Sequence, residues 1–366
     1  MQLPILRDAK VEGKTVFLRA DLDVPLSEFR IEDDTRLTAA LPTIEYLLKQ
    51  NCKIIIGGHL GRPTGLNQES RIRNPHFARA SRGRQELSLK PVGEWFAKHF
   101  HASQFIIHNS ILGGFEGWEI GQNSFLLENL RFYEGEEKND LIFSKKLASL
   151  ADLYVNDAFA MCHRNHASIV GITHFLPHFA GFHLQKEVET LSHVMENPKR
   201  PLVVIVGGKK IETKLPLVEK MHKVADYVLV GGKIAEESKA LVNVQHEKIT
   251  GKKAVLLVAD AIPDGSDITD KDAENFLQII SLAKTIIWNG SMGIIENEKL
   301  MGESTRKIAL GIIKSGAYSV VGGGDTVEFL NKLGVLDKFS FASTGGGAML
   351  AFLSGEKLPG IEALLQ

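Results

Sequence analysis

Charged and hydrogen-bonding side chains directly follow several short apolar runs in the first half of the sequence. These side chains are Arg19, Asp21, Asp23, His59, Arg62, Arg131, His163, Arg164 and His166. In an open α/β sheet, ligands bind outside the carboxyl ends of the strands, so these positions are the first to examine. A single arginine is usually a surface ion-pair partner that contributes little energy. Several cations at one sheet edge instead indicate an anionic ligand.

Glycine-rich turns take the same place in the second half. They are GGKK at 207–210, GGK at 231–233, NGSMG at 289–293, GGGDT at 322–326 and GGGA at 345–348. Glycine lets the backbone approach a phosphate closely, and the N–H groups at the start of the next helix complement its charge. One such turn is weak evidence, but their recurrence predicts a polyphosphate site. Neither a Walker A loop nor a GxGxxG dinucleotide fingerprint is present.

Three charged residues stand beside these glycine turns. Asp325 follows the triple glycine, where its carboxylate could hold Mg²⁺ on phosphate oxygens or could act as the N-cap of a helix. Lys210 and Lys214 are one helical turn apart, so both ammonium groups could face one polyphosphate.

The elements that position these residues follow an alternating pattern of strands and helices. Short β-rich runs lie at 16–18, 53–56, 105–107, 124–127 and 153–155 in the first half, and at 202–206, 227–230, 254–259, 285–288, 318–321 and 339–343 in the second. Helical spacing is found at 41–49, 215–221 and 326–333. Such alternation predicts parallel sheets wrapped by helices in both halves.

Composition narrows the class of protein. The chain has 366 residues with 44% hydrophobic content, which favours two domains over one. A formal net charge of -1 argues against a nucleic-acid partner, and the basic segment at 71–90 is interpreted as a solvated loop. Cys52 and Cys162 match no zinc-ligand spacing and favour a reducing compartment. No apolar run spans a bilayer and no secretory leader is evident, so we expect a cytoplasmic protein without a membrane partner.

The sequence resembles the phosphoglycerate kinase family along nearly its whole length. The motifs that carry this resemblance are RADLDVP, DDTRLTAALPTI, HLGRP, LENLRF, NDAF with HRNHAS, AGFHLQKE, GGKKIETK, AKTIIWNGSMG, GGGDT and STGGGA. The resemblance implies two doubly wound parallel-sheet domains. The expected organisation is a 3-phosphoglycerate domain at 1–175, a connecting helix and hinge at 176–197, a nucleotide domain at 198–350, and a C-terminal tail at 351–366 that packs on the first domain.

The resemblance also assigns site residues. The implied substrate-binding positions are Asp21, Asp23, Arg36, His59, Arg62, Arg131 and Arg164. The implied nucleotide-binding positions are Gly208, Lys214, Gly232, Asn289, Glu296, Gly323, Gly324, Asp325 and Thr326, with Asp325 as the magnesium ligand of MgATP or MgADP and Glu296 near the ribose. Arg36 and Lys210 are the implied catalytic cations.

The implied reaction is reversible phosphoryl transfer between 1,3-bisphosphoglycerate and ADP, which gives 3-phosphoglycerate and ATP in glycolysis or gluconeogenesis. In the ATP-consuming direction the acceptor is a carboxylate, which is ionised near neutral pH, so no general base is needed. Catalysis then depends on in-line positioning and on stabilising charge on the transferred group. We expect a monomer in which domain closure brings the two ligands together.

Several residues depart from the family pattern. Asp23 replaces a usual Asn, Ala160 and Met161 replace a usual Gly-Thr, and Ser291 replaces a usual Pro. Asp23 could repel the anionic substrate and weaken its binding, or it could pair with Arg19 or another substrate-site arginine and hold it in place. A family member kept only as a binding or scaffold protein is the alternative function. A nicotinamide dehydrogenase is the second alternative, which the missing dinucleotide fingerprint argues against.

Overall fold

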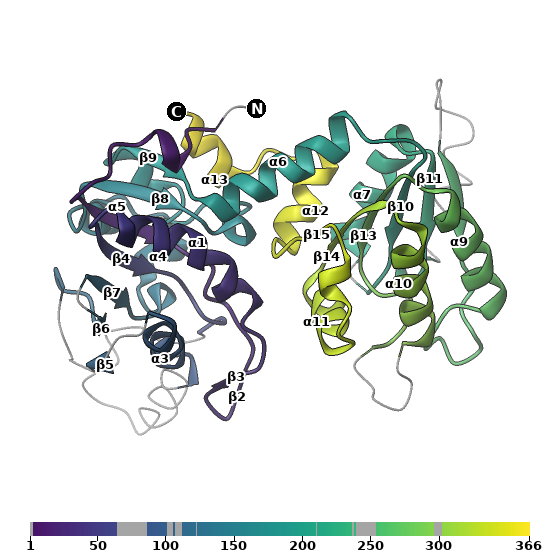
Figure 1. Ribbon diagram of the computed structural model, residues 1–366, viewed down its shortest axis with the longest axis horizontal. Helices are drawn as coiled ribbons and strands as arrows, with labels where there is room; N and C mark the ends of the chain where they lie inside the picture. Colours follow the sequence, from purple (N-terminus) through teal and green to yellow (C-terminus); the bar gives the residue numbers. More distant parts are fainter. Residues whose placement is uncertain are drawn as a thin grey trace. The chain divides into compact units, whose positions relative to one another are not determined.

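The structure is a computed structural model that describes residues 3–63, 86–100, 105–106, 112–121, 123–209, 211–235, 238, 254–295 and 302–366. Contacts between Cα atoms group the chain into two units (Figure 1). The first unit comprises Met1–Lys186 and Leu358–Gln366, and the second comprises Glu187–Lys357. Both units are built on predominantly parallel sheets, so the predicted α/β fold class is confirmed.

The sheet of the first unit has seven strands in the order β5-β6-β7-β4-β1-β8-β9. The strands are β1 (Thr15–Arg19), β4 (Lys53–Gly57), β5 (Phe105–Ile106), β6 (Gly117–Ile120), β7 (Ser124–Leu127), β8 (Leu153–Asn156) and β9 (His178–Ala180). β6 is antiparallel to both of its neighbours. Strands β6 and β9 were not predicted from the sequence, because they are short and lack a run of β-branched residues. The remaining sheet neighbours, β7-β4-β1-β8-β9, are parallel.

Side chains on both faces of this sheet are buried, as a doubly wound fold requires. On one face, Val16 and Leu18 of β1 belong to an apolar cluster with residues of α1 (Thr35–Lys49) and α3 (Lys90–His99). On the other face, the ring of Phe17 lies 6.2 Å from that of Tyr154. Alternation along the strand therefore supplies both layers. The shorter elements of the unit are β2 (Leu26–Ser27), β3 (Arg30–Ile31), α4 (Glu134–Glu137) and α5 (Leu141–Ala148).

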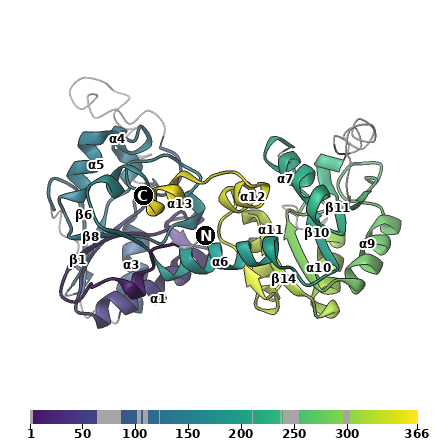
Figure 2. The same ribbon diagram turned by 90° about the horizontal axis from the view of Figure 1, so that it is seen from above.

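The sheet of the second unit has six parallel strands in the order β12-β11-β10-β13-β14-β15. They are β10 (Leu202–Val206), β11 (Tyr227–Val230), β12 (Val255–Val258), β13 (Thr285–Asn289), β14 (Tyr318–Gly322) and β15 (Phe341–Ala342). Each of them coincides with an apolar run that the sequence analysis identified. Its helices are α7 (Ile211–Val224), α9 (Asp270–Leu282), α10 (Glu303–Ser315), α11 (Gly324–Lys332) and α12 (Gly347–Ser354). Helices α9 and α10 pack together, as do α7 and α12 (Figure 2).

Helix α6 (Phe182–Glu196) contains the division between the two units. It begins later than the expected connecting segment, because β9 occupies 178–180. The carboxylate of Asp157 accepts hydrogen bonds from the N–H groups of His183 (2.9 Å) and Leu184 (3.2 Å) at the start of this helix. Near its C-terminus the chain returns to the first unit through α13 (Pro359–Glu362), where Gly360 N–H donates to the carbonyl of Cys162 (2.9 Å). The expected C-terminal tail is divided: residues 351–357 belong to the second unit, and only the residues from Leu358 onward belong to the first.

Candidate active site

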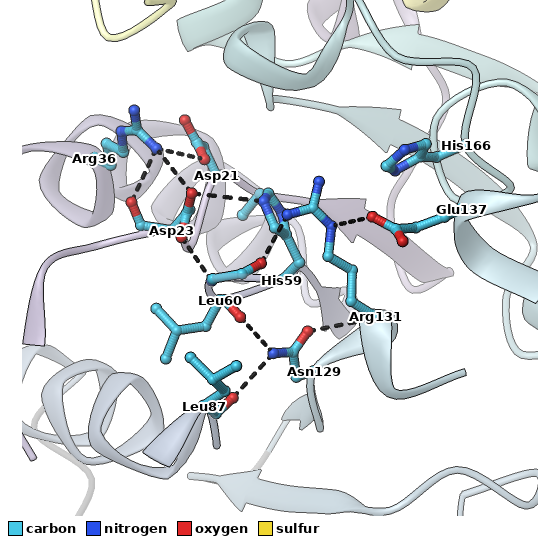
Figure 3. A network of polar contacts seen from close by, with 12 residues as sticks. Asp21, Asp23, Arg36, His59, Leu60, Leu87, Asn129, Arg131, Glu137 and His166 are labelled. Carbon is cyan, nitrogen blue, oxygen red and sulfur yellow. Dashed lines mark hydrogen bonds and ion pairs between the residues drawn. The ribbon is translucent and has the colours of Figure 1, made fainter. Parts of the chain in front are cut away.

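Polar side chains gather at the carboxyl ends of adjacent strands in the first unit (Figure 3). Asp21 and Asp23 follow β1, and His59 follows β4. Arg131 lies in the 3-10 turn Leu130–Phe132 after β7. Since β7, β4 and β1 are consecutive in the parallel part of the sheet, their carboxyl ends lie at one edge. The topology thus brings together residues that are up to 110 positions apart in the sequence.

Arg36, in the first turn of α1, is held by the loop that follows β1. Its Nη1 donates to the carbonyl of Asp23 (2.9 Å) and to Oδ1 of Asp21 (3.4 Å), and it lies 3.9 Å from Oδ2 of Asp23. The Asp21 side chain is only 3% exposed, and burial raises its pKa despite the opposing charge of Arg36. Its Oδ2 has no hydrogen-bond partner among the described residues, so one buried acceptor is left for a ligand.

Asp23 contacts donors on two sides. Its Oδ1 accepts a hydrogen bond from Gly61 N–H (2.8 Å), which fixes the loop after β4. Its Oδ2 lies 3.7 Å from Nε2 of His59 and 3.9 Å from Nη1 of Arg36. Among the described residues, the arginine beside Asp23 is therefore Arg36, whereas Arg19 contacts other groups, which corrects that alternative. The shortest contact of Asp23 is the one to the neutral backbone N–H of Gly61.

Arg19 follows an apolar run and was therefore grouped with the cations that face a ligand. The structure corrects this interpretation, because Arg19 is not exposed at the site. The residue is fully buried. Its Nε donates to Oγ of Ser168 (2.8 Å), its Nη1 donates to the carbonyl of Ala20, and its Nη2 lies 3.2 Å from Nδ1 of His59. Burial, reinforced by the charge of Arg19, lowers the pKa of His59 well below its ordinary value. His59 is therefore neutral and adds a polar group to the site without adding charge.

Arg131 is fixed by backbone and side-chain partners. Its Nη1 donates to the carbonyl of Gly61 (2.7 Å), and its Nε lies 3.1 Å from Oε1 of Glu137. Asn129 supports this turn, because its Oδ1 accepts from the N–H of Arg131 and its Nδ2 donates to the carbonyls of Leu60 (2.7 Å) and Leu87 (2.9 Å). Asn129 was missed in the sequence analysis, although it lies inside the LENLRF motif.

Arg62 and Arg164 are exposed and stand outside this network. Within the described residues, no hydrogen bond or ion pair joins either side chain to it. Arg164 nevertheless adds to the local positive potential: burial, followed by the charges of Arg131, Arg19 and Arg164, lowers the pKa of His166 to about 3. The site therefore presents free positive charge at its rim and paired positive charge in its interior.

In the second unit, glycine-rich turns lie at the carboxyl ends of the strands, where the first unit has polar side chains. A Cβ atom on Gly207 would lie 2.1 Å from the carbonyl oxygen of Ser291, and one on Gly232 would lie 2.6 Å from the backbone N of Gly208. A Cβ on Gly290 would lie 2.1 Å from the carbonyl oxygen of Gly207. The turns after β10, β11 and β13 thus pack backbone against backbone, which only glycine permits.

Helix α11 presents its first N–H groups next to these turns. Its N-cap is Gly323, with a φ of 96°, and its first turn contains Gly324, Asp325 and Thr326. The first N–H groups of a helix have no partner inside the helix and favour an anion. Asp325 is exposed and is not the N-cap, which corrects that alternative, while its exposed carboxylate fits a metal that takes few protein ligands. Asn289 is buried beside Gly323, with its Nδ2 3.7 Å from Sδ of Met349.

Lys214 lies in the first turns of α7 with its ammonium group buried. The group donates to the carbonyl of Gly207 and lies 3.4 Å from the carbonyl of Asn289, at the ends of β10 and β13. Its place at the glycine turns agrees with the expected position, although its donors are directed at backbone carbonyls. Lys210 and Glu296 lie outside the described residues.

Comparison with known proteins identifies one family. The family model described as phosphoglycerate kinase matches residues 6–254 and 240–356. A phosphoglycerate kinase of Leptospira biflexa serovar Patoc is 39% identical over 405 residues, which covers 100% of this chain and 99% of the relative. The structure of phosphoglycerate kinase from Coxiella burnetii matches with a TM-score of 0.80 and 32% identity, over 100% of this chain and 99% of that one. The phosphoglycerate kinase of Pyrococcus horikoshii OT3 matches with a TM-score of 0.78 and 29% identity, over 99% and 98%.

Two glycines of the second unit should respond differently to alanine. Gly290→Ala combines a φ of 96° with a Cβ only 2.1 Å from the Gly207 carbonyl oxygen, so we expect the free energy of unfolding to fall by about 2 kcal/mol or more.

Gly324→Ala places its Cβ where no atom lies within 4 Å, so the free energy of unfolding should be unchanged or slightly raised. It should still weaken ATP binding about tenfold, the factor for about one hydrogen bond, because an added methyl group in the first turn of α11 would crowd a phosphate at the N–H groups of that turn. Calorimetric unfolding and ATP titration test this, and unaltered ATP affinity in Gly324→Ala would contradict the phosphate site.

Proposed function

The chain belongs to the phosphoglycerate kinase family, and we propose that it transfers a phosphoryl group reversibly between 1,3-bisphosphoglycerate and ADP, giving 3-phosphoglycerate and ATP. The observation that carries this function is the 39% identity to a phosphoglycerate kinase over the full length of both chains. The enzyme is therefore a phosphotransferase with a carboxyl group as acceptor. Nothing favours a descendant that only binds or scaffolds.

The first unit would bind 3-phosphoglycerate. The residues proposed for this role are Asp21, Asp23, Arg36, His59, Arg62, Arg131 and Arg164. Exposed and partly exposed guanidinium groups suit the phosphate and carboxylate of this ligand, because they pair with both in a planar, bidentate manner. The buried Oδ2 of Asp21, which has no partner among the described residues, suits a hydroxyl donor on the same ligand. This combination supports a small hydroxy acid phosphate over a simple phosphate ion.

The second unit would bind the nucleotide. Gly208, Gly232, Gly323 and Gly324 provide close backbone approach, and the start of α11 provides N–H donors. Asp325 would hold Mg²⁺, which would neutralise phosphate charge when the nucleotide is bound. The other residues proposed for the nucleotide are Lys214, Asn289, Glu296 and Thr326.

The chemistry needs little from the protein beyond position and charge. The attacking group in the ATP-consuming direction is a carboxylate, so the chain has no proton to remove from it. Arg36 and Lys210 would stabilise the negative charge on the transferred phosphoryl group. Arg36 suits this role because its Nη1 is already fixed by the Asp23 carbonyl and by Asp21, which lowers the cost of ordering it.

We further propose a cytoplasmic monomer that acts on these small molecules and has no nucleic-acid partner. The balanced net charge of -1 and the buried cysteines Cys52 and Cys162, neither of which forms a disulfide, support this environment. No helix in the described part of the chain has the length and apolar character to traverse a bilayer.

A coupled assay tests the function directly. Purified protein should consume ATP only when both 3-phosphoglycerate and Mg²⁺ are present, and chelation of magnesium should abolish turnover. Absence of turnover with both substrates at millimolar levels would contradict the proposed reaction. Turnover that survives removal of the metal would contradict the role of Asp325.

Arg36→Ala should lower kcat by about two or more powers of ten and change KM less, as loss of a preorganised donor to the transition state does. Steady-state kinetics with both substrates measure this. Arg200→Ala is the matched control, since Arg200 is a partly exposed arginine whose ion pair with Asp226 lies in the second unit, and it should leave kcat unchanged. If Arg36→Ala raised KM with a near-normal kcat, Arg36 would serve ground-state binding instead.

Asp23→Asn should lower the KM for 3-phosphoglycerate several-fold. An asparagine oxygen can keep the 2.8 Å hydrogen bond from Gly61. The lost interactions are the ion pair with Arg36 at 3.9 Å and the contact with the neutral His59 at 3.7 Å, and because the Asp23 carboxylate is 38% exposed they contribute about 0–1 kcal/mol. Repulsion of a substrate charge about 5 Å away amounts to about 3 kcal/mol before screening, so the repulsion is the larger effect. Titration at two salt concentrations tests it: the gain should be greatest at low salt, and a raised KM would show that Asp23 is needed to hold Arg36.

A further inference from the structure

A chain of buried polar groups leads from the interior of the first unit to His59. It starts at Glu136, which is completely buried. Oε1 of Glu136 accepts a hydrogen bond from the Ser168 hydroxyl (2.6 Å), and Oε2 accepts one from the Ser168 N–H (3.0 Å). The Ser168 hydroxyl donates its proton to the hydrogen bond with Glu136. Its oxygen can therefore accept a hydrogen bond from Nε of Arg19, which lies 2.8 Å away.

Each nitrogen of the buried Arg19 guanidinium has a partner. Besides Ser168, these partners are the carbonyl of Ala20 and Nδ1 of His59, which lies 3.2 Å from Nη2. A guanidinium group has donors only, so Nη2 donates in this contact and Nδ1 of His59 accepts. A neutral imidazole that accepts at Nδ1 carries its proton at Nε2. The position of one buried arginine therefore determines the tautomer of His59.

We infer that Arg19, anchored by Ser168 and Glu136, is a positioning residue that holds His59 as the neutral Nε2–H tautomer. The role of His59 toward the substrate rests on the proposed function. In that role, His59 would offer the substrate site a fixed neutral hydrogen-bond donor without adding charge. Its Nε2 faces Oδ2 of Asp23 at 3.7 Å (Figure 3). The donor therefore lies beside the loop that also holds Arg36.

The surroundings of His59 oppose a second proton. The charged and titratable groups that face it are Arg19 on β1, Arg36 on α1, Arg131 after β7, His166 after β8, and Asp23 after β1. Burial comes first among the causes that lower its pKa, and the positive groups act in the same direction. The negative charge of Asp23, whose Oδ2 lies 3.7 Å from Nε2, acts against them. A protonated ring would also turn Nδ1 from an acceptor into a donor that faces Arg19 Nη2.

The tautomer can be measured without substrate, so the test is independent of the reaction. In ¹⁵N NMR spectra of histidine-labelled, ligand-free protein, Nε2 of His59 should carry the proton and Nδ1 should have the shift of an unprotonated ring nitrogen. His59→Gln assigns the resonance by its loss. A proton on Nδ1, or a doubly protonated ring at neutral pH, would overturn the inference whatever the enzyme catalyses.

Ser168→Ala tests the anchoring of Arg19. It removes the acceptor for Nε and keeps the Ser168 backbone contacts, so we expect the His59 signal to shift toward a tautomer mixture and the KM for 3-phosphoglycerate to rise about three- to tenfold, the factor for one hydrogen bond. The KM for MgATP should stay unchanged. Ser144→Ala is the matched control, because Ser144 is a buried serine of the same unit whose hydroxyl donates to the Asp140 carbonyl (2.8 Å).

The two variants separate positioning from general destabilisation. If Ser168→Ala and Ser144→Ala gave the same His59 spectrum and the same KM, Ser168 would be structural only and the anchoring part of the inference would be overturned. If the wild-type spectrum shows the Nε2–H tautomer but no substrate turns over, the proposed function fails while the tautomer assignment stands.

Discussion

Like charges at one sheet edge repel each other, and the first unit depends on how this repulsion is offset. Arg19 is taken out of contact with solvent and given a partner for each nitrogen, with Glu136 reached through Ser168. Burying a guanidinium group without such partners would lower the free energy of unfolding by several kcal/mol, because the charge would lose its hydration. Arg36 and Arg131 are held by backbone carbonyls and carboxylates, and Arg62 and Arg164 are exposed at the rim. The interior charge thus organises the site, while the charges at its rim remain available to a ligand.

The second unit also presents positive groups to an anion, but it uses backbone N–H groups for this instead of arginine side chains. It places glycine backbones, and the start of α11, at the carboxyl ends of its strands. Backbone N–H groups carry only partial charge, so several can converge on a polyphosphate without the repulsion that clustered arginines experience. The close packing of Gly207, Gly232 and Gly290 leaves no space for side chains in these turns. We therefore propose that one unit recognises its anion mainly through side chains, and the other mainly through the backbone.

Much of this could be predicted from the sequence, because buried parallel strands produce apolar runs and ligands bind where those runs end. The six strands of the second unit and the placement of Asp21, His59 and Arg131 at one edge follow from that rule. The state of Arg19 could not be predicted, since its partner Ser168 is 149 positions away and only the folded chain shows which arginine is buried. Strand β6 and the role of Asn129 were missed because a short antiparallel strand and a turn-supporting amide leave no periodic signal.

We propose that each unit recognises one of the two substrates by its own chemistry. Amide chemical shift mapping tests this most directly, with 3-phosphoglycerate and MgADP added separately to labelled protein. We expect 3-phosphoglycerate to shift the amide of Gly61 and its neighbours in the first unit, and MgADP to shift those of Gly232, Gly323 and Gly324 in the second. If 3-phosphoglycerate instead shifted the glycine turns, or if both ligands shifted the same unit, the account would be contradicted.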